Sequence, residues 1–397
     1  MARSSRTSAT RAVPDDVLLM ATPTKNADMR WFSGFHASDP FPAFSAQGRK
    51  IGLVPLLEVG RAKAEADFFE VQNLTEIIND LRRTNPTAGI PDAIVFAALQ
   101  QGVKKFRVAA DFPATLFLRL QELGLELIPA GSRHDVRATP ALFPARTVKS
   151  PAELAGIRAG NKAACAGFTA VEQALAASRP NRRGELVWKG KVLTSEILQS
   201  EVQAAVVRAG GLCDTGLICA PGDQAVDCHC KGSGPIHANE LLVLDIFPRD
   251  LASWNYGDMT RTYLKGKASP AQRKMVLAVK EAHRRIIKAI RAGVTGAAIH
   301  QIPVDYFKSL GYVTGPNKDG VYVGFFHGSG HGLGYDIHEE PYFSPRNLSP
   351  LVVGNAITVE PGLYYLGLGG CRFEDCIVVT KTGCELLSKH PYRWEIA

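Results

Sequence analysis

Carboxylate side chains inside apolar, strand-like runs are the feature that most constrains how this chain can fold. Three such runs occur, at Glu240–Phe247, Ala356–Glu360 and Cys371–Thr380. A buried carboxylate without a partner is costly and takes up a proton rather than stay charged. One such acid would suit a structural ion pair, but three in separate runs indicate a shared cation. We therefore expect the runs to meet around one or two divalent metal ions.

The acids in these runs are Asp245, Glu360 and Glu374, and Asp258 enters a fourth predicted strand, Met259–Leu264. Hard oxygen ligands collected from several strands suit a divalent cation. The four carboxylates are therefore candidate metal ligands.

A glycine-rich segment that begins at His327 adds nitrogen ligands to these oxygens. His331 lies four residues after His327, and His338 follows seven residues after His331. Glycine at alternate positions lets the backbone approach a neighbour closely or adopt unusual φ and ψ angles. Such a segment alone is more often a plain loop, but beside four carboxylates it favours a functional site.

Other site motifs do not account for the sequence. It contains no HExxH motif, no G-x-G-x-x-G or P-loop motif and no G-x-S-x-G turn. Cys228-His229-Cys230 could form half of a zinc site, but no second pair stands at a finger-like spacing. A structural zinc ion there is therefore disfavoured.

Composition predicts an ordinary globular protein of the cytoplasm. The net charge of +8 over 397 residues is too weak to indicate nucleic-acid binding, and the eight cysteines are far from disulfide-scaffold density. No apolar run reaches the length of a membrane span. We expect a flexible basic tail over residues 1–15, with a transit-like segment as the alternative.

Two domains are expected, with a boundary at Ser150-Pro151-Ala152-Glu153, which has the form of a capping box. Residues 16–146 alternate strands and helices and predict an α/β domain, in which Asp92 would cap a helix at Asp92–Gln101. Residues 147–397 carry helices and strands in runs, which favours an α+β fold. The helices expected there are Ser150–Ala177, Ser195–Gly210, Pro270–Gly293 and Ala297–Leu310.

At these residues the sequence resembles the pita-bread metallopeptidases, in particular the Xaa-Pro branch of aminopeptidase P and prolidase. The resemblance runs over nearly the whole chain, and Met29–Phe35 is similar to the opening of a creatinase-type N-terminal domain. The flanks Gly257–Thr262, Thr358–Gly362 and Arg372–Asp375 match most closely. The resemblance implies an α+β fold in which a smaller α/β domain precedes a C-terminal pita-bread domain.

The resemblance also implies a ligand set for two divalent ions. Asp258 and Glu374 would bridge the ions, Asp245 would chelate one, and His331 and Glu360 would hold the other. Glu360 would also be the proton shuttle. Two metal ions that share one water molecule can lower the pKa of that water toward neutrality. Manganese is favoured, with cobalt, zinc and iron as alternatives, because mixed Asp, Glu and His ligation suits all four.

Four further residues are implied to contact the substrate. His229, His327 and His338 fall at the pocket histidines of the proline-specific branch, and His229 and His338 would assist catalysis. Arg372 would bind substrate or orient Glu374, with which it shares a strand face. The plainer alternatives are a strand-edge ion pair for Arg372 and a solvated loop position for His338.

By the same strand alternation, Thr358 faces the same way as Glu360 and is a candidate partner for it.

The segment between the first two acids departs from the family pattern. The family has D-x-G at the first ligand, whereas Asp245 is followed by Ile-Phe-Pro, and Asp258 comes thirteen residues later. The inserted segment contains Arg249, Trp254 and Tyr256. Asp250 is the less favoured alternative for the first ligand, and the insertion leaves the substrate preference open.

The predicted function is hydrolysis of the Xaa-Pro bond at the N-terminus of peptides or in dipeptides. The substrate would be a peptide with proline at its second position, and the resemblance suggests a homodimer. Two alternatives remain: a non-catalytic pita-bread protein that binds partners, and an aminopeptidase of other specificity. Retention of all five ligand residues argues against the first.

Overall fold

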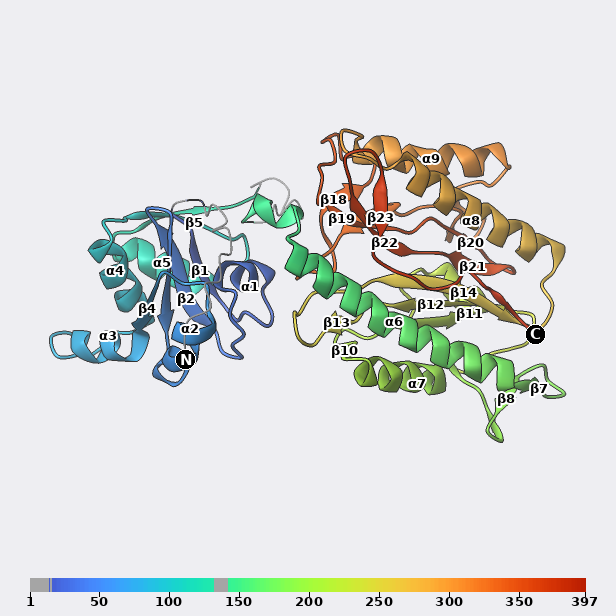
Figure 1. Cartoon of the computed structure of the whole chain (residues 1–397), viewed down its shortest axis with the longest axis horizontal. Coiled ribbons are helices and arrows are strands. Elements are labelled where there is room, and N and C mark those ends of the chain that lie inside the picture. The colour runs from blue at the N-terminus through green and yellow to red at the C-terminus, as the bar shows by residue number, and fades with distance from the viewer. Residues whose placement is uncertain (1–13, 15, 132–141) are drawn as a thin grey trace. The chain divides into compact units, whose positions relative to one another are not determined.

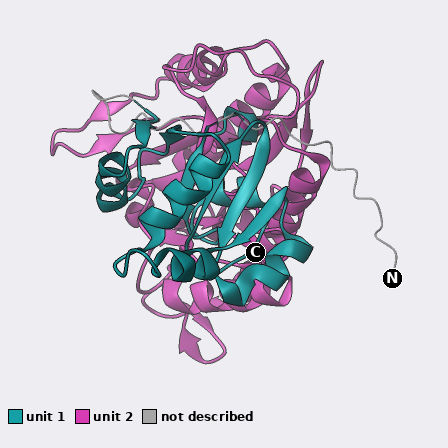
Figure 2. Ribbon diagram, turned by 90° about the vertical axis from the view of Figure 1, so that its left-hand side faces the viewer, with its two compact units in different colours: residues 1–146 teal, residues 147–397 magenta. Residues whose placement is uncertain are grey.

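The computed structural model describes residues 14, 16–131 and 142–397 (Figure 1). Apart from residue 14, the tail expected over residues 1–15 lies outside the described residues. Two compact units are present, residues 1–146 and 147–397 (Figure 2). Within the described ranges, no helix combines the length and the apolar character that crossing a membrane requires.

The first unit is a small α/β domain. Its main sheet has the order β1-β2-β3-β4, and β5 and β6 form a parallel pair. The strands are β1 (Leu18–Ala21), β2 (Phe41–Ala46), β3 (Arg49–Val54), β4 (Glu70–Asn73), β5 (Lys105–Val108) and β6 (Glu126–Pro129). The helices are α1 (Ala27–Ser33), α2 (Val59–Glu65), α3 (Leu74–Leu81), α4 (Ile90–Gln100) and α5 (Ala114–Glu122).

The predicted N-cap of α4 is wrong. Gly89 occupies that position, and Asp92 lies one turn inside, where its carboxylate accepts a 2.9 Å hydrogen bond from the Gly89 N–H. Pro91 fits the first turn because it needs no hydrogen-bond acceptor for a backbone N–H there. Asp92 therefore stabilises the N-terminus of the helix from a position in its first turn.

The second unit begins with the long helix α6 (Pro151–Ala177). Ser150 is its N-cap, and the Glu153 carboxylate accepts a 2.8 Å hydrogen bond from the Ser150 N–H, which confirms the predicted capping box. The other helices are α7 (Ser195–Arg208), α8 (Pro270–Ala289) and α9 (Gly296–Ser309). Helices α6 and α7 lie side by side, as do α8 and α9, on different sides of the strands (Figure 1).

Two sheets of the second unit contain Asp245 and His331, and the other three acids lie directly beside the ends of their strands. One has the order β11-β12-β14-β24, and the other has the order β18-β17-β19-β22-β23. The first contains β11 (Ile218–Pro221), β12 (Leu241–Ile246), β14 (Met259–Lys265) and β24 (Glu395–Ile396). The second contains β17 (Gly330–Gly332), β18 (Glu339–Phe343), β19 (Ala356–Val359), β22 (Asp375–Val379) and β23 (Cys384–Leu386).

Shorter strands complete this unit. They are β7 (Arg179–Pro180), β8 (Leu186–Trp188), β9 (Lys191–Val192), β10 (Gly211–Leu212), β13 (Arg249–Asp250), β15 (Gly315–Pro316), β16 (Tyr322–Val323), β20 (Gly362–Tyr365) and β21 (Gly369–Arg372). Strand β10 pairs with β13, and β20 pairs with β21.

The single strand predicted over Cys371–Thr380 is in fact two strands, β21 and β22, which belong to different sheets. The break falls at Glu374, whose N–H donates to the carbonyl of Thr260 on β14. The buried guanidinium of Arg261 donates to the carbonyl of Glu374 at 2.7 Å. These cross-sheet bonds replace the strand pairing that Glu374 gives up.

Candidate metal centre

One cavity of about 540 Å³ in the second unit gathers the predicted site residues. This volume falls in the usual range of small-molecule sites. The lining includes all nine of those residues: Asp245, Asp258, His331, Glu360, Glu374, His229, His327, His338 and Arg372. Residues separated by more than 100 positions in the sequence therefore face one space.

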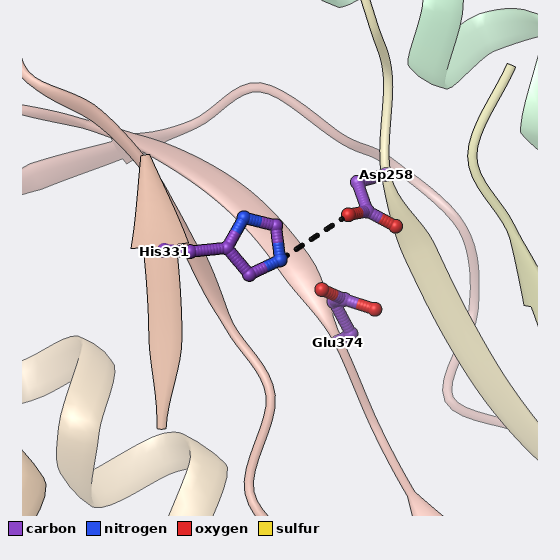
Figure 3. A group of neighbouring side chains, drawn as sticks. All are labelled: Asp258, His331 and Glu374. Atoms are coloured by element: carbon purple, nitrogen blue, oxygen red, sulfur yellow. Dashed lines mark ion pairs between the residues drawn. The ribbon is translucent and has the colours of Figure 1, made fainter. Parts of the chain in front are cut away.

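Three of these side chains form a compact group of ligand atoms. Asp258, His331 and Glu374 are all buried, and each offers a ligand atom within 4.8 Å of the others. The side chains point toward one another from three different segments (Figure 3). The His331 Nε2 atom lies 3.5 Å from Asp258 Oδ2 and 3.4 Å from Glu360 Oε1. Glu360 therefore borders the same group.

Neighbouring strands place the acids. Asp245 lies on β12 opposite Thr260 of β14, and Asp258 immediately precedes β14. Because antiparallel neighbours lie about 4.8 Å apart, the two carboxylates enter the cavity from adjacent strands.

Glycine allows the close approach that positions His331. A Cβ atom on Gly330 would lie 2.0 Å from the carbonyl oxygen of Thr358 on β19. The next residue, His331, donates its N–H to Thr358 Oγ1 at 3.1 Å. The alternating glycines thus let β17 press against β19, and His331 faces the acids as a result.

The electrostatics of the group fit a bound cation. Burial, followed by the charge of Glu374, raises the pKa of Asp258 well above its ordinary value. Burial also raises the pKa of Glu374 and of Glu360. In addition, Asp245 Oδ1 is buried and has no hydrogen-bond partner among the described residues. A divalent cation would stabilise the charged carboxylates and use the free oxygen of Asp245.

A second layer of polar side chains fixes the acids. Arg372 donates from Nη2 to Asp245 Oδ2 at 2.7 Å and from Nε to Thr260 Oγ1 at 3.1 Å. Thr260 Oγ1 in turn donates to Glu374 Oε2 at 2.7 Å. Arg372 thus bonds Asp245 directly and reaches Glu374 only through Thr260, because the strand breaks between them.

Thr358 behaves as the strand alternation predicts. Its hydroxyl lies 3.4 Å from Glu360 Oε1, as a donor to that carboxylate, while it accepts the N–H of His331. One threonine therefore holds two candidate ligands in register.

The three remaining histidines occupy different surroundings. His327 is held by Tyr364, whose hydroxyl lies 2.9 Å from His327 Nε2, and burial lowers the pKa of His327 to about 3. His338 is exposed to the cavity, and its ring stands edge-on to that of His331 at 4.4 Å between centroids. His229 is also exposed at the cavity.

Sequence reasoning missed Tyr364. This buried residue of β20 donates to or accepts from His327 Nε2 and also accepts a 2.9 Å hydrogen bond from Arg372 Nη1. It therefore links the histidine segment to the strand that carries Arg372. No motif marks it, because its role depends on the pairing of β20 with β21.

Of the residues between Asp245 and Asp258, only Phe247 lines the cavity. Its strand β13 pairs with β10, and the Arg249 guanidinium lies over the Tyr256 ring at 4.4 Å from the ring centroid. The carboxylate of Asp250 accepts a hydrogen bond from the Ser253 N–H at 2.7 Å. Asp250 thus stabilises the turn of the insertion, while Asp245 faces the cavity, which favours Asp245 as the first ligand.

Comparison with known proteins places the chain in a family. The sequence model of Metallopeptidase family M24 matches residues 155–381, which is more than half of the chain. The chain belongs to this family. Membership implies divalent metal ions, in agreement with the carboxylate and histidine donors around the cavity.

Individual relatives match over different lengths. The Xaa-Pro dipeptidase of Pyrococcus furiosus is 35% identical over 156 residues, which cover 39% of this chain and 41% of that protein. The probable dipeptidase PepE of Mycobacterium tuberculosis is 27% identical over 303 residues, 76% of this chain and 72% of that protein.

The fold is shared with solved structures. The X-Pro aminopeptidase of Thermotoga maritima aligns with a TM-score of 0.75 at 23% identity, covering 96% of this chain and 97% of that one. This likeness confirms the expected α+β architecture, in which a smaller N-terminal domain precedes a C-terminal pita-bread domain in the sequence.

Proposed function

We propose that the protein is a metal-dependent exopeptidase that hydrolyses the bond between an N-terminal residue and a following proline. The observation that carries this proposal is that four carboxylates and His331 line one cavity together with three further histidines. The names of the relatives, an Xaa-Pro dipeptidase and an X-Pro aminopeptidase, support the choice of bond.

The residues proposed to hold two divalent ions are Asp245, Asp258, His331, Glu360 and Glu374. Asp258 and Glu374 are the proposed bridging ligands, Asp245 would serve one ion, and His331 with Glu360 would serve the other. The buried, mutually repelling carboxylates and the unpartnered Asp245 oxygen support this set. When bound, such ions supply Lewis-acid activation of water and of the scissile carbonyl.

The chain's own residues would position the substrate and move the proton. Glu360 accepts a proton from the attacking water as its oxygen bonds to the carbonyl carbon. Glu360 then passes this proton to the proline nitrogen as the C–N bond breaks. His229 and His338, both exposed to the cavity, donate hydrogen bonds to the carbonyl oxygen as negative charge develops on it.

Proline at the second position leaves the scissile nitrogen without an N–H. Recognition must therefore come from the carbonyl side and from the surface around the ring. Phe247, Ile337 and Tyr342 line the cavity and offer apolar surface for a proline ring. His327, which is held in place by the Tyr364 hydroxyl, would form another part of the cavity surface around the proline ring.

The test is hydrolysis of Xaa-Pro dipeptides beside matched Xaa-Ala dipeptides after chelation, with and without added Mn²⁺. We expect metal-dependent cleavage of the proline substrates and at least tenfold slower cleavage of the alanine ones. Faster cleavage of the alanine series would favour an aminopeptidase of other specificity. Metal binding without cleavage of either series would favour the non-catalytic alternative.

Three finer points belong to the same proposal: manganese as the physiological ion, a homodimer and a cytoplasmic location. Manganese is supported by the mixture of carboxylate and imidazole donors, which also suits cobalt, zinc and iron. Metal analysis of the purified protein tests the ion, light scattering tests the dimer, and fractionation tests the location.

A further inference from the structure

The histidine segment, residues 327–331, is held at its central residue. Ser329 is fully buried and lies between the two histidines of the segment, both of which line the cavity. Its N–H donates to the carbonyl of Phe343 on β18 at 2.8 Å, and its carbonyl accepts the N–H of Glu360 at 2.9 Å. The main chain of Ser329 therefore connects the histidine segment to the proposed proton shuttle.

The side chain of Ser329 is held by a helix. Its hydroxyl lies 2.8 Å from Nδ1 of His300, a buried residue of α9. Burial lowers the pKa of His300, so the ring is neutral at neutral pH and can accept the hydroxyl proton or donate to the hydroxyl oxygen. Breaking a hydrogen bond between two buried groups is costly, because each is left without a partner. The bond therefore fixes Ser329 against α9.

The same histidine also supports His327 through an aromatic contact. The rings of His300 and Phe325 lie 5.5 Å apart between centroids, with an angle of 36° between their planes. Phe325 in turn stands edge-on to His327, at 5.2 Å and 78°. His300 thus supports the histidine segment at two points, by a hydrogen bond at its centre and by an aromatic ring at its start.

The helix that carries His300 is itself packed closely against the sheet that contains His331. A Cβ atom on Gly296, the first residue of α9, would lie 2.2 Å from the carbonyl oxygen of Tyr342 on β18. The N–H of the next residue donates to the carbonyl of Asn347 at 2.8 Å. His300 lies about one turn further along α9. Its position relative to the sheet is therefore fixed by the close packing at the start of the helix.

We propose that His300 is a positioning residue for the metal centre. Through Ser329 it fixes the main chain between His327 and His331, together with the hydrogen bond from Glu360. This inference rests on the proposed metallopeptidase function and adds to it a residue that does not line the cavity. Removing a partner that orients metal ligands costs about 10- to 100-fold in metal affinity or activity. His300 acts by the same means, one residue further from the ions.

The test compares three replacements of His300 that differ in what they offer Ser329. His300→Phe keeps a ring against Phe325 and removes the hydrogen bond. His300→Asn carries its amide on Cγ, the atom to which Nδ1 is bonded, whereas His300→Gln carries its amide one bond further out. We expect the Phe and Gln variants to weaken Mn²⁺ binding about 10- to 100-fold and to lower kcat at saturating Mn²⁺. The Asn variant should restore most of both.

Two measurements on each variant separate positioning from folding. The Kd for Mn²⁺ is measured without substrate, from the electron paramagnetic resonance of free Mn²⁺, and kcat and KM are measured on an Xaa-Pro dipeptide. Ser329→Ala removes the other partner of the bond, so adding it to His300→Phe should weaken Mn²⁺ binding no further. Gln301→Ala is the matched control, because this exposed neighbour on α9 bonds Asp305 of the same helix. It should match the wild-type protein.

The outcomes separate this inference from the function on which it rests. A His300→Phe variant that is less stable to urea but keeps wild-type Mn²⁺ affinity and kcat would overturn the inference, because His300 would then serve folding alone. Equal values for the Asn and Gln variants would overturn it too. If His300→Phe does not fold, Ser329→Ala provides the same comparison. Wild-type protein that binds Mn²⁺ but cleaves no Xaa-Pro peptide would instead overturn the proposed function, and the Mn²⁺ affinities would still test His300.

Discussion

At the scale of single residues, the proposed bridging ligand Glu374 depends on bonds from both its main chain and its side chain. Its N–H and carbonyl bond to Thr260 and Arg261, and its carboxylate accepts the Thr260 hydroxyl. These hydrogen bonds hold Glu374 in position without a bound cation, but they leave its buried negative charge to be balanced by the metal. Changing the charge alone should therefore affect metal binding more than folding.

Glu374→Gln and Asp258→Asn test this expectation. Each change removes a proposed bridging charge while nearly preserving the shape of the side chain, so we expect both variants to lose metal and activity and to remain folded. Asp319→Asn, at an exposed position, is the control. Metal content by mass spectrometry and Xaa-Pro hydrolysis should be measured on the same preparation. Full metal occupancy with normal turnover in both variants would contradict the dinuclear assignment.

His338→Ala tests the contact with the substrate. The ring is exposed to the cavity and stands against His331, but it is not one of the proposed ligands. We expect the variant to retain its metal and to lose 10²- to 10³-fold in kcat/KM, the usual effect of removing one oxyanion donor. An active variant would return His338 to the role of a solvated loop residue. A metal-free variant would mean that the ligand set is wrong.

At the scale of elements, local signals predicted helices well and strand breaks poorly. The capping boxes at Ser150 and Ser269 mark the starts of α6 and α8 because both partners of each box lie within one turn. The break at Glu374 depends on bonds from Thr260 and Arg261, more than 100 residues away. Nothing in the apolar run Cys371–Thr380 itself indicates those distant partners, so its pattern predicts one continuous strand.

A buried ion pair anchors the strand that follows His338. Lys149 Nζ pairs with the carboxylate of Glu339 at the start of β18, and the two side chains are only 2% and 8% exposed. Lys149→Met would leave the Glu339 charge buried, so we expect a loss of about 3–5 kcal/mol in the free energy of unfolding. Adding Glu339→Leu should recover most of that loss, because it removes the remaining charge.

Urea denaturation measures both effects on this pair. Lys189→Met, which breaks a pair whose side chains are 68% and 39% exposed, is the control and should cost less than about 1 kcal/mol. A cost below about 1 kcal/mol for Lys149→Met would show that water compensates the Glu339 charge in spite of its burial.

At the scale of the whole molecule, the sequence predicted which residues meet but not the shape of the space between them. Residue type and order singled out the acids and histidines, since buried charge in apolar strands needs a common partner. The cavity itself arises from two sheets and from pairings such as Ile218 with Asp245. Tyr364 belongs to the site only through such pairings, and it carries no motif.

Each compact unit has its own hydrophobic core, and this separation leads to a prediction about the complete chain. Phe106 and Leu120 are fully buried in the core of the first unit, whereas all the proposed ligands belong to the second. Proteins with more than one domain often unfold in more than one step. We therefore expect calorimetry of the metal-loaded protein to show two transitions, of which only one depends on metal.

Metal binding should stabilise the second unit, because an ion that binds only the folded site adds about 2.7 kcal/mol at 100 times its Kd. For a unit of this size, that amount corresponds to roughly 5–10 °C in Tm. Chelation should lower one transition by this amount, and added Mn²⁺ should restore it. Leu120→Ala, which creates a cavity in the first core, should lower only the other transition. If chelation and Leu120→Ala lower the same transition, the two units unfold together, and the metal stabilises the chain as one body.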